Sequence, residues 1–116
     1  MRRALEIDES SFGPEHPNVA IDLNNLAQLL QDTHRLEEAE PLMRQSSLIL
    51  LNFTSKTGHE HPSIRTSLKN YKILLDELSL SQAERTEKLD SLGPEANWKK
   101  EEWLRWKDDV LSEENR

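Results

Sequence analysis

Histidine and glutamate are the residues of this chain whose spacing comes nearest to a metal site. His59 and His61 flank Glu60, and His16 lies in a similar stretch, GPEHPNV, at residues 13–19. A catalytic zinc site needs three protein ligands that converge on one point. These histidines lie in separate turns between expected helices, and their spacing differs from the H-E-x-x-H helix of a zinc protease. The sequence therefore predicts no metal site.

Residue patterns for other kinds of catalysis are also missing. Adjacent glutamates such as Glu37 and Glu38 do not face each other on a helix, because only residues three or four positions apart do. The 116 residues contain no cysteine, no G-x-S-x-G motif and no phosphate-binding loop. We therefore expect a protein that is not an enzyme and uses no cofactor.

Composition narrows the class of partner. The formal net charge is −7, whereas nucleic-acid binding needs clustered lysine and arginine. The apolar stretch at residues 48–53 is too short for a membrane span, which takes about 20 residues. The first residues lack the apolar segment of a secretory leader, and the absence of cysteine fits a reducing compartment. We expect a cytoplasmic protein that binds neither nucleic acid nor a membrane.

An internal repeat indicates how the chain is organised. The segment GPEHPNV at residues 13–19 returns as GHEHPSI at residues 58–64. At the same spacing, Leu23 and Asn25 meet leucine and asparagine again. A period of about 20 to 50 residues is typical of stacked helical units, none of which can bury its apolar face alone.

Apolar periodicity predicts the contents of each unit. One helix follows Pro17, and a helix with the same apolar stripe follows Pro62. A second helix begins near Leu36, and its counterpart at residues 81–92 is weaker. A divergent, charged helix is expected over residues 95–113. The two stripes comprise Val19, Leu23, Leu26 and Leu30, and Ile64, Leu68, Tyr71, Leu75 and Leu78.

Three segments carry a resemblance to a known family. The stretches LNNLAQLL at residues 23–30, EEAEPLMRQS at 37–46 and RRALEIDESSFGPEHPNVA at 2–20 resemble the long tetratricopeptide repeats of the kinesin-light-chain type. The repeat length also overlaps the armadillo and HEAT range. The residues of the three segments favour the tetratricopeptide family. The resemblance covers about residues 1–85 and implies small residues where helices cross. Those residues are Ala27, Ala39 and Ser46.

Together these patterns predict an all-α, right-handed solenoid of helical hairpins with about five helices. The repeat array is expected over residues 1–92, with a half-repeat at 1–13, a repeat at 14–58 and a divergent repeat at 59–92. A capping helix and tail are expected over residues 93–116.

The resemblance also implies a binding face. In such arrays the first helix of each unit lines a concave groove that holds a peptide. Family members that clamp a terminal carboxylate use several basic groove residues, whereas this face offers Lys69 beside three acidic residues. We therefore expect a neutral or basic peptide or protein partner. The expected partner-binding residues are Asn24, Gln28, Gln31, Lys69 and Ile73, with Ile21, Asp32, Thr66, Asp76 and Glu77 on the same face.

Three tryptophans close to the carboxyl end admit two interpretations. Trp103 and Trp106 are three residues apart on one helical face, which indicates that they pack the cap onto the array. Trp98 points in another direction and is a possible exposed anchor for a partner.

The expected function is a scaffold for protein–protein interaction on the concave face. An alternative is a self-associating module, a homodimer that pairs through the half-repeat at residues 1–13. A further alternative is that the chain is the non-catalytic C-terminal end of a larger repeat protein.

Overall fold

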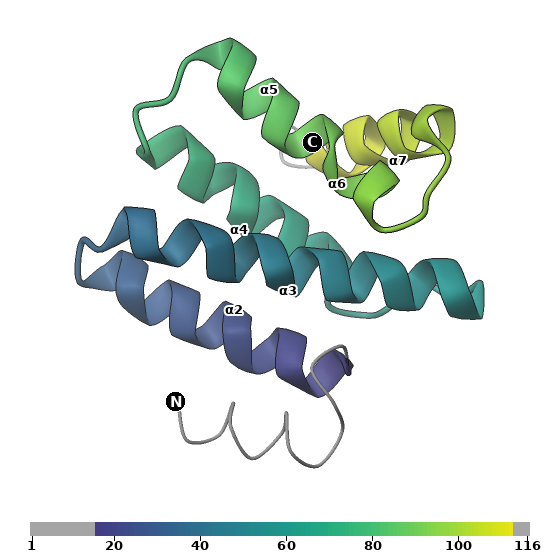
Figure 1. Cartoon of the computed structure of the whole chain (residues 1–116), viewed down its shortest axis with the longest axis horizontal. Coiled ribbons are helices and arrows are strands. Elements are labelled where there is room, and N and C mark those ends of the chain that lie inside the picture. Colours follow the sequence, from purple (N-terminus) through teal and green to yellow (C-terminus); the bar gives the residue numbers. More distant parts are fainter. Residues whose placement is uncertain (1–15, 113–116) are drawn as a thin grey trace.

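Helices that follow one another along the chain pack in antiparallel pairs (Figure 1). The computed structural model describes residues 16–112, so the half-repeat predicted at residues 1–13 lies outside the described part. In residues 16–112 five helices have nine or more residues, and a four-residue helix precedes the last of them. The predicted all-α stack of hairpins is confirmed, and its right-handed sense stays a prediction. The helices are α2 (Pro17–Asp32), α3 (Leu36–Thr57), α4 (Ile64–Glu77), α5 (Gln82–Asp90), α6 (Leu92–Glu95) and α7 (Lys100–Ser112).

The ends of α2 are fixed by local chemistry. The helix begins at Pro17, whose missing N–H removes no intrahelical bond from the first turn. The Nδ1 atom of His16 accepts a hydrogen bond from the N–H of Asn18 at 3.1 Å, so this histidine caps the helix. At the other end, His34 has a left-handed backbone with φ of 62°. Its N–H donates to the carbonyl of Gln31 at 3.1 Å, which closes the helix as a left-handed cap does.

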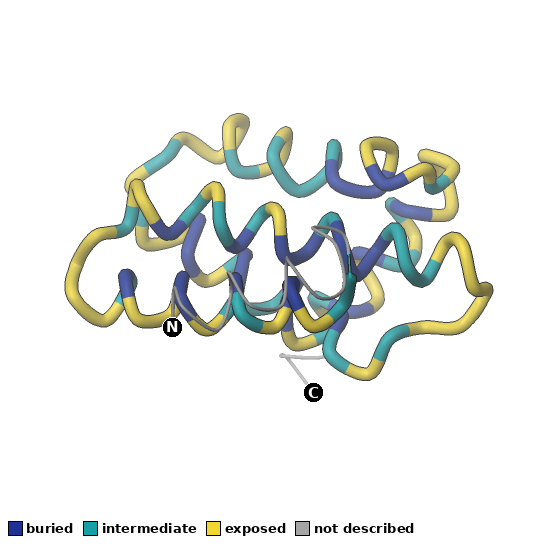
Figure 2. The backbone as a smooth tube through the Cα atoms, turned by 60° about the horizontal axis from the view of Figure 1, so that its bottom comes forward, coloured by how far each residue is buried: buried dark blue, intermediate teal, exposed yellow. Residues whose placement is uncertain are grey.

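The predicted apolar stripes form the core between the helices. The buried residues lie on the sides of the helices that face each other (Figure 2). Of the stripe residues, only Leu78 is half-buried, and the others are buried. The small residues predicted at the helix crossings, Ala27, Ala39 and Ser46, are fully buried. Ser46 also donates a hydrogen bond from Oγ to the carbonyl of Ala20 at 2.6 Å, which ties α3 to α2.

A second pair of hydroxyls joins α3 to α4. Ser47 and Ser67 are 0% and 3% exposed, and their Oγ atoms share a hydrogen bond of 2.9 Å. We expect either Ser47→Ala or Ser67→Ala to lower the free energy of unfolding by about 1 to 2 kcal/mol, because one buried hydroxyl loses its partner. The double variant should lose less than the sum. Urea unfolding of all four proteins tests this, and strictly additive losses would contradict it.

The carboxyl-terminal helices depart from the prediction. A helix over residues 95–113 is wrong at its start, because the chain turns between α6 and α7. Asn97 takes a left-handed backbone with φ of 70°. The N–H of Trp98 donates to the carbonyl of Gly93 at 2.9 Å, and the N–H of Asn97 donates to that of Pro94 at 3.2 Å. This pair of bonds is a Schellman motif, which ends a helix.

α5 packs weakly, as expected for the second helix of the divergent unit. None of its residues is fully buried, and Ala83 is exposed. Ion pairs hold it instead: Lys88 Nζ lies 3.0 Å from Glu40 Oε1 of α3, and Arg85 Nη1 lies 3.1 Å from Asp76 Oδ1 of α4.

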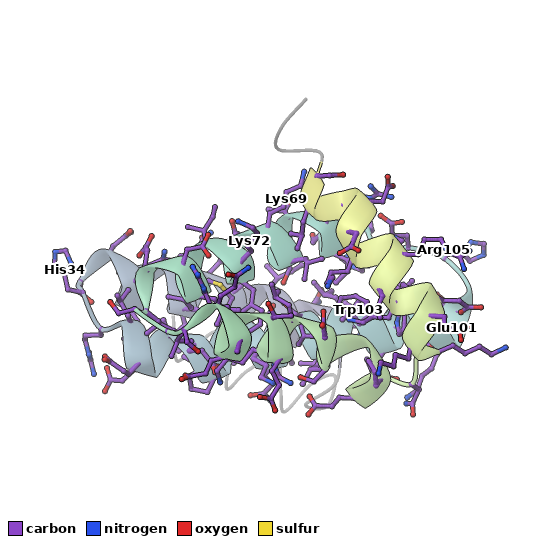
Figure 3. The ribbon with its side chains drawn as sticks, turned by 90° about the horizontal axis from the view of Figure 1, so that it is seen from above. His34, Lys69, Lys72, Glu101, Trp103 and Arg105 are labelled. Carbon is purple, nitrogen blue, oxygen red and sulfur yellow. The ribbon has the colours of Figure 1, made fainter. Side chains whose placement is uncertain are left out.

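α7 covers the end of the stack. Trp103 and Val110 are fully buried, and Trp106 packs against the core, which confirms the predicted docking of this helix. Figure 3 shows Trp103 on the inner side of α7, with Glu101 and Arg105 on its outer side. Lys107 is 9% exposed and forms an ion pair with Asp90 of α5. Within residues 16–112, no helix is both long and apolar enough to cross a membrane.

Candidate functional site

The first helices of the two units carry exposed side chains on the side away from the core. Ile21 is 39% exposed on α2, and Ile73 is 44% exposed on α4. Large apolar side chains with this exposure are uncommon among the described residues. Polar neighbours lie around them, some exposed and some half-buried. We call this surface the α2–α4 face and define it by Ile21, Asn24, Gln28, Gln31, Asp32, Thr66, Lys69, Ile73 and Glu77.

A cavity of about 190 Å³ opens between the amino-terminal halves of α2 and α4. Ile21, Asn24 and Thr66 line it at positions predicted from the sequence. Ser63 and Ser67 line it as well, and sequence reasoning missed them. The available signal was their four-residue spacing, which places Ser63, the residue before α4, on the same side as Ser67.

Asn24 has an unsatisfied polar atom at this cavity. Its Oδ1 is buried and accepts no hydrogen bond in the structure of residues 16–112. A buried carbonyl oxygen without a donor costs about 1 to 3 kcal/mol. A ligand with an N–H group in the cavity would remove this cost.

The carboxyl-terminal ends of α2 and α4 meet in an acidic area. Gln31 donates from Nε2 to Glu77 Oε1 at 3.0 Å, so these two predicted residues are brought together. Asp32 is exposed beside them. Asp76 points away, because its carboxylate contacts Lys72 and an arginine of α5.

Lys69 lies apart from this acidic area. It is half-buried, and Figure 3 shows it beside the carboxyl-terminal half of α7. Lys72 lies one turn further along α4 and its Nζ is 3.1 Å from Asp76 Oδ2. The single lysine predicted for the face therefore does not neutralise Asp32 or Glu77.

Trp98 is not the exposed anchor that its helical angle predicted. Its ring is half-buried and packs 5.8 Å from Trp103 and 5.3 Å from Trp106, measured between ring centroids. Its Nε1 donates to the carbonyl of Leu51 at 2.9 Å. The prediction is wrong because Trp98 lies in the turn before α7, so its direction does not follow that helix.

A larger hollow of about 730 Å³ runs along the outer side of α7. The described residues that line it, Trp106 among them, all come from this one helix, so it is open to solvent. The ring of Trp106 is already covered by Arg65, whose guanidinium carbon lies 5.7 Å from the ring centroid, and by the other two tryptophans. This hollow has less of the enclosure that fixes a ligand than the cavity between α2 and α4.

The repeated histidines lie in the turns before α2 and α4, as the sequence indicated, and accept hydrogen bonds from the backbone there. His16 caps α2, and His61 accepts a hydrogen bond at Nδ1 from the N–H of Ser63 at 3.0 Å. The ring of His61 also lies edge-on to Phe53, with centroids 5.4 Å apart. Among residues 16–112, no three histidines or carboxylates converge in a way that could hold a metal ion.

His61 should make stability depend on pH. Burial lowers its pKa below the ordinary value of 6.5. Because the folded chain holds this proton less tightly, the contribution of His61 is complete above about pH 6.5 and is lost as the pH falls through the folded pKa. We expect His61→Gln to lose less stability than the natural chain on going from about pH 7 to about pH 5 in urea unfolding. His59→Gln is the control, and parallel curves for His61→Gln and the natural chain would contradict the assignment.

Comparison with known proteins agrees with the repeated helical hairpins. The family model described as tetratricopeptide repeat matches residues 1–51, which include α2 and most of α3. No curated protein matches the chain significantly. The kinesin-light-chain type of repeat stays a prediction. The match to the family model shows that the chain carries a tetratricopeptide repeat over residues 1–51.

Proposed function

We propose that the protein is a non-catalytic scaffold that binds a partner protein through an extended segment laid on the α2–α4 face. Tetratricopeptide repeats are generally protein-interaction modules, and this face has the exposed apolar and amide side chains that such binding uses. Ile21 and Ile73 offer apolar contact, and Gln28 and Asn24 offer hydrogen bonds.

The observation that carries the proposal is the buried, unpartnered Oδ1 of Asn24 at the cavity. An extended peptide presents one backbone N–H per residue, which is the donor that this atom lacks. Peptide binding thus compensates a cost that the free protein bears.

This leads to opposite expected effects of Asn24→Leu on stability and on binding. Leucine has a similar size without the polar atom, so the free energy of unfolding should rise by about 1 kcal/mol. Binding of peptides selected from a random decapeptide library should weaken about tenfold, because the hydrogen bond and the polar lining are lost. Urea unfolding and fluorescence titration measure the two effects.

Gln82→Leu is the matched control, since Gln82 is an exposed amide on α5. It should change neither quantity appreciably. Gln28→Ala serves as a second test of the face, with weaker peptide capture and an intact fold expected, because Gln28 is exposed there and offers hydrogen bonds. Peptides that bind Asn24→Leu as tightly as the natural chain would contradict the proposal.

A second candidate function is self-association. It is favoured by the different exposure of two equivalent leucines in the two repeats. Leu29 of α2 and Leu74 of α4 occupy equivalent positions of the repeat, yet Leu29 is 47% exposed and Leu74 is 0% exposed. Leu29 is thus exposed on α2 at the position where α4 buries the equivalent side chain. Burial of Leu29 by a second copy would complete this packing.

Light scattering coupled to size exclusion tests this candidate over about a hundredfold range of concentration. A dimer that Leu29→Lys converts to a monomer would support it. A monomeric mass at every concentration would exclude it and leave the α2–α4 face as the proposed interaction surface.

A further inference from the structure

We infer that the segment bound by the α2–α4 face carries a small uncharged side chain followed, about four residues away, by lysine or arginine. This inference rests on the proposed function and adds the chemistry of the partner. It comes from the different character of the two ends of the face.

The amino-terminal end of the face takes the uncharged side chain. The cavity there is about 190 Å³, and its lining comes from side chains without charge, among them Ile21, Asn24 and Thr66. The hydroxyls at its floor already have partners, because Ser46 donates to the carbonyl of Ala20 and Ser67 bonds to Ser47. A buried charge would find no counter-ion in this cavity, so a small aliphatic or hydroxyl side chain fits best.

The carboxyl-terminal end of the face attracts the basic residue. Asp32 and Glu77 are exposed, and Glu77 accepts a hydrogen bond from the neutral amide of Gln31. No ion pair joins Asp32 or Glu77 to another residue in the described range 16–112. A cation of the partner would therefore meet two carboxylates that the fold leaves uncompensated.

The charged residues next to Asp32 and Glu77 leave the carboxyl-terminal end of the face acidic. Asp76 is already paired with Lys72 and Arg85, and Arg35 in the following turn is paired with Glu38. These cations are therefore engaged elsewhere and do not neutralise the acidic end.

The distance between the two ends of the α2–α4 face determines how many residues separate the uncharged and the basic side chain of the partner. Eight positions separate Asn24 from Asp32 on α2, which is about 12 Å at 1.5 Å per helical residue. An extended peptide advances about 3.3 Å per residue. The two anchors of the partner should thus lie about four residues apart when the segment runs along the helices.

Selection from a displayed library of random decapeptides tests the inference on the full chain. Selected peptides should be enriched in alanine, valine, serine or threonine about four positions from lysine or arginine. The double variant Asp32→Lys and Glu77→Lys should bind these peptides about tenfold more weakly and should itself select peptides with aspartate or glutamate at the second position.

A matched control reverses two charges elsewhere. Glu84 and Glu87 are exposed on α5, so Glu84→Lys with Glu87→Lys changes the net charge equally without touching the face. This control should keep the peptide preference of the natural chain. If the control loses the preference for lysine or arginine, as the double variant of Asp32 and Glu77 is expected to, the attraction depends on net charge alone. The inference is then overturned.

The test separates failure of the inference from failure of the proposed function. Peptides that depend on Asn24 but show no preference for a basic residue would overturn the inference and leave the proposed function standing. Peptides whose binding is insensitive both to Asn24→Leu and to the charge reversal would overturn both.

Discussion

Gly93→Ala is expected to lower the free energy of unfolding by about 2 to 3 kcal/mol. A methyl group at this position would lie 2.1 Å from Cγ and 2.4 Å from Cδ2 of Trp103. Trp103 is fully buried and cannot move aside without disturbing the packing of α7. The better helix propensity of alanine would offset only about 1 kcal/mol of this loss.

Urea unfolding followed by tryptophan fluorescence measures this effect, and Gly58→Ala is the matched comparison. Gly58 has a left-handed backbone with φ of 73°, but nothing lies within 4 Å of an added Cβ. We expect Gly58→Ala to cost about 1 kcal/mol from backbone strain alone. A Gly93→Ala protein as stable as the natural chain would show that Trp103 is not packed as described.

Arg44→Met is expected to cost about 2 to 4 kcal/mol. The guanidinium of Arg44 on α3 is mostly buried and holds three other helices. Nη1 donates to Tyr71 Oη at 3.2 Å and to the carbonyl of Lys88 at 2.9 Å, while Nη2 donates to Ser91 Oγ at 2.8 Å and to Glu95 Oε2 at 2.6 Å. Methionine keeps the apolar stem but leaves these groups without their donor.

Two further variants separate the geometry of Arg44 from its charge. Arg44→Lys keeps the charge but lacks the planar fork, so it should recover only part of the stability. Glu95→Gln should cost less than Arg44→Met, because the Glu95 side chain is 52% exposed. Hydrogen exchange should show faster opening of α5 and α6 in Arg44→Met. Equal stability of Arg44→Met and the natural chain would contradict this role.

The sequence was sufficient for α2, α3 and α4 because their apolar residues recur at the spacing of one helical face. The stripe from Val19 to Leu30 predicted which side of α2 is buried, and His16 with Pro17 predicted where that helix begins. These features depend on residues close together in the chain, which periodicity and capping rules describe.

The carboxyl-terminal third was harder to predict because its packing depends on residues far apart in the chain. Gly93 resembles a turn glycine in the sequence, yet it lies in α6 and makes room for Trp103. Trp98 reaches the carbonyl of Leu51, 47 positions away, and Arg44 reaches Glu95, 51 positions away. Local sequence patterns such as apolar periodicity do not predict contacts over these distances in the chain.

The candidate site was predicted in part. The repeat pattern placed Asn24 and Thr66 on one face, and both line the cavity. It did not indicate that Lys69 lies by α7 or that Gln31 bonds to Glu77. Those details depend on how α7 and α4 pack, which the periodicity of each helix alone does not determine.

Backbone amide NMR tests the central claim most directly, with a selected decapeptide titrated into the isotope-labelled chain. The claim predicts that the largest shift changes fall on α2 and α4, at Ile21, Asn24, Thr66 and Ile73, and that Asn24→Leu abolishes them. Changes confined to the outer side of α7, with α2 and α4 unaffected, would contradict it.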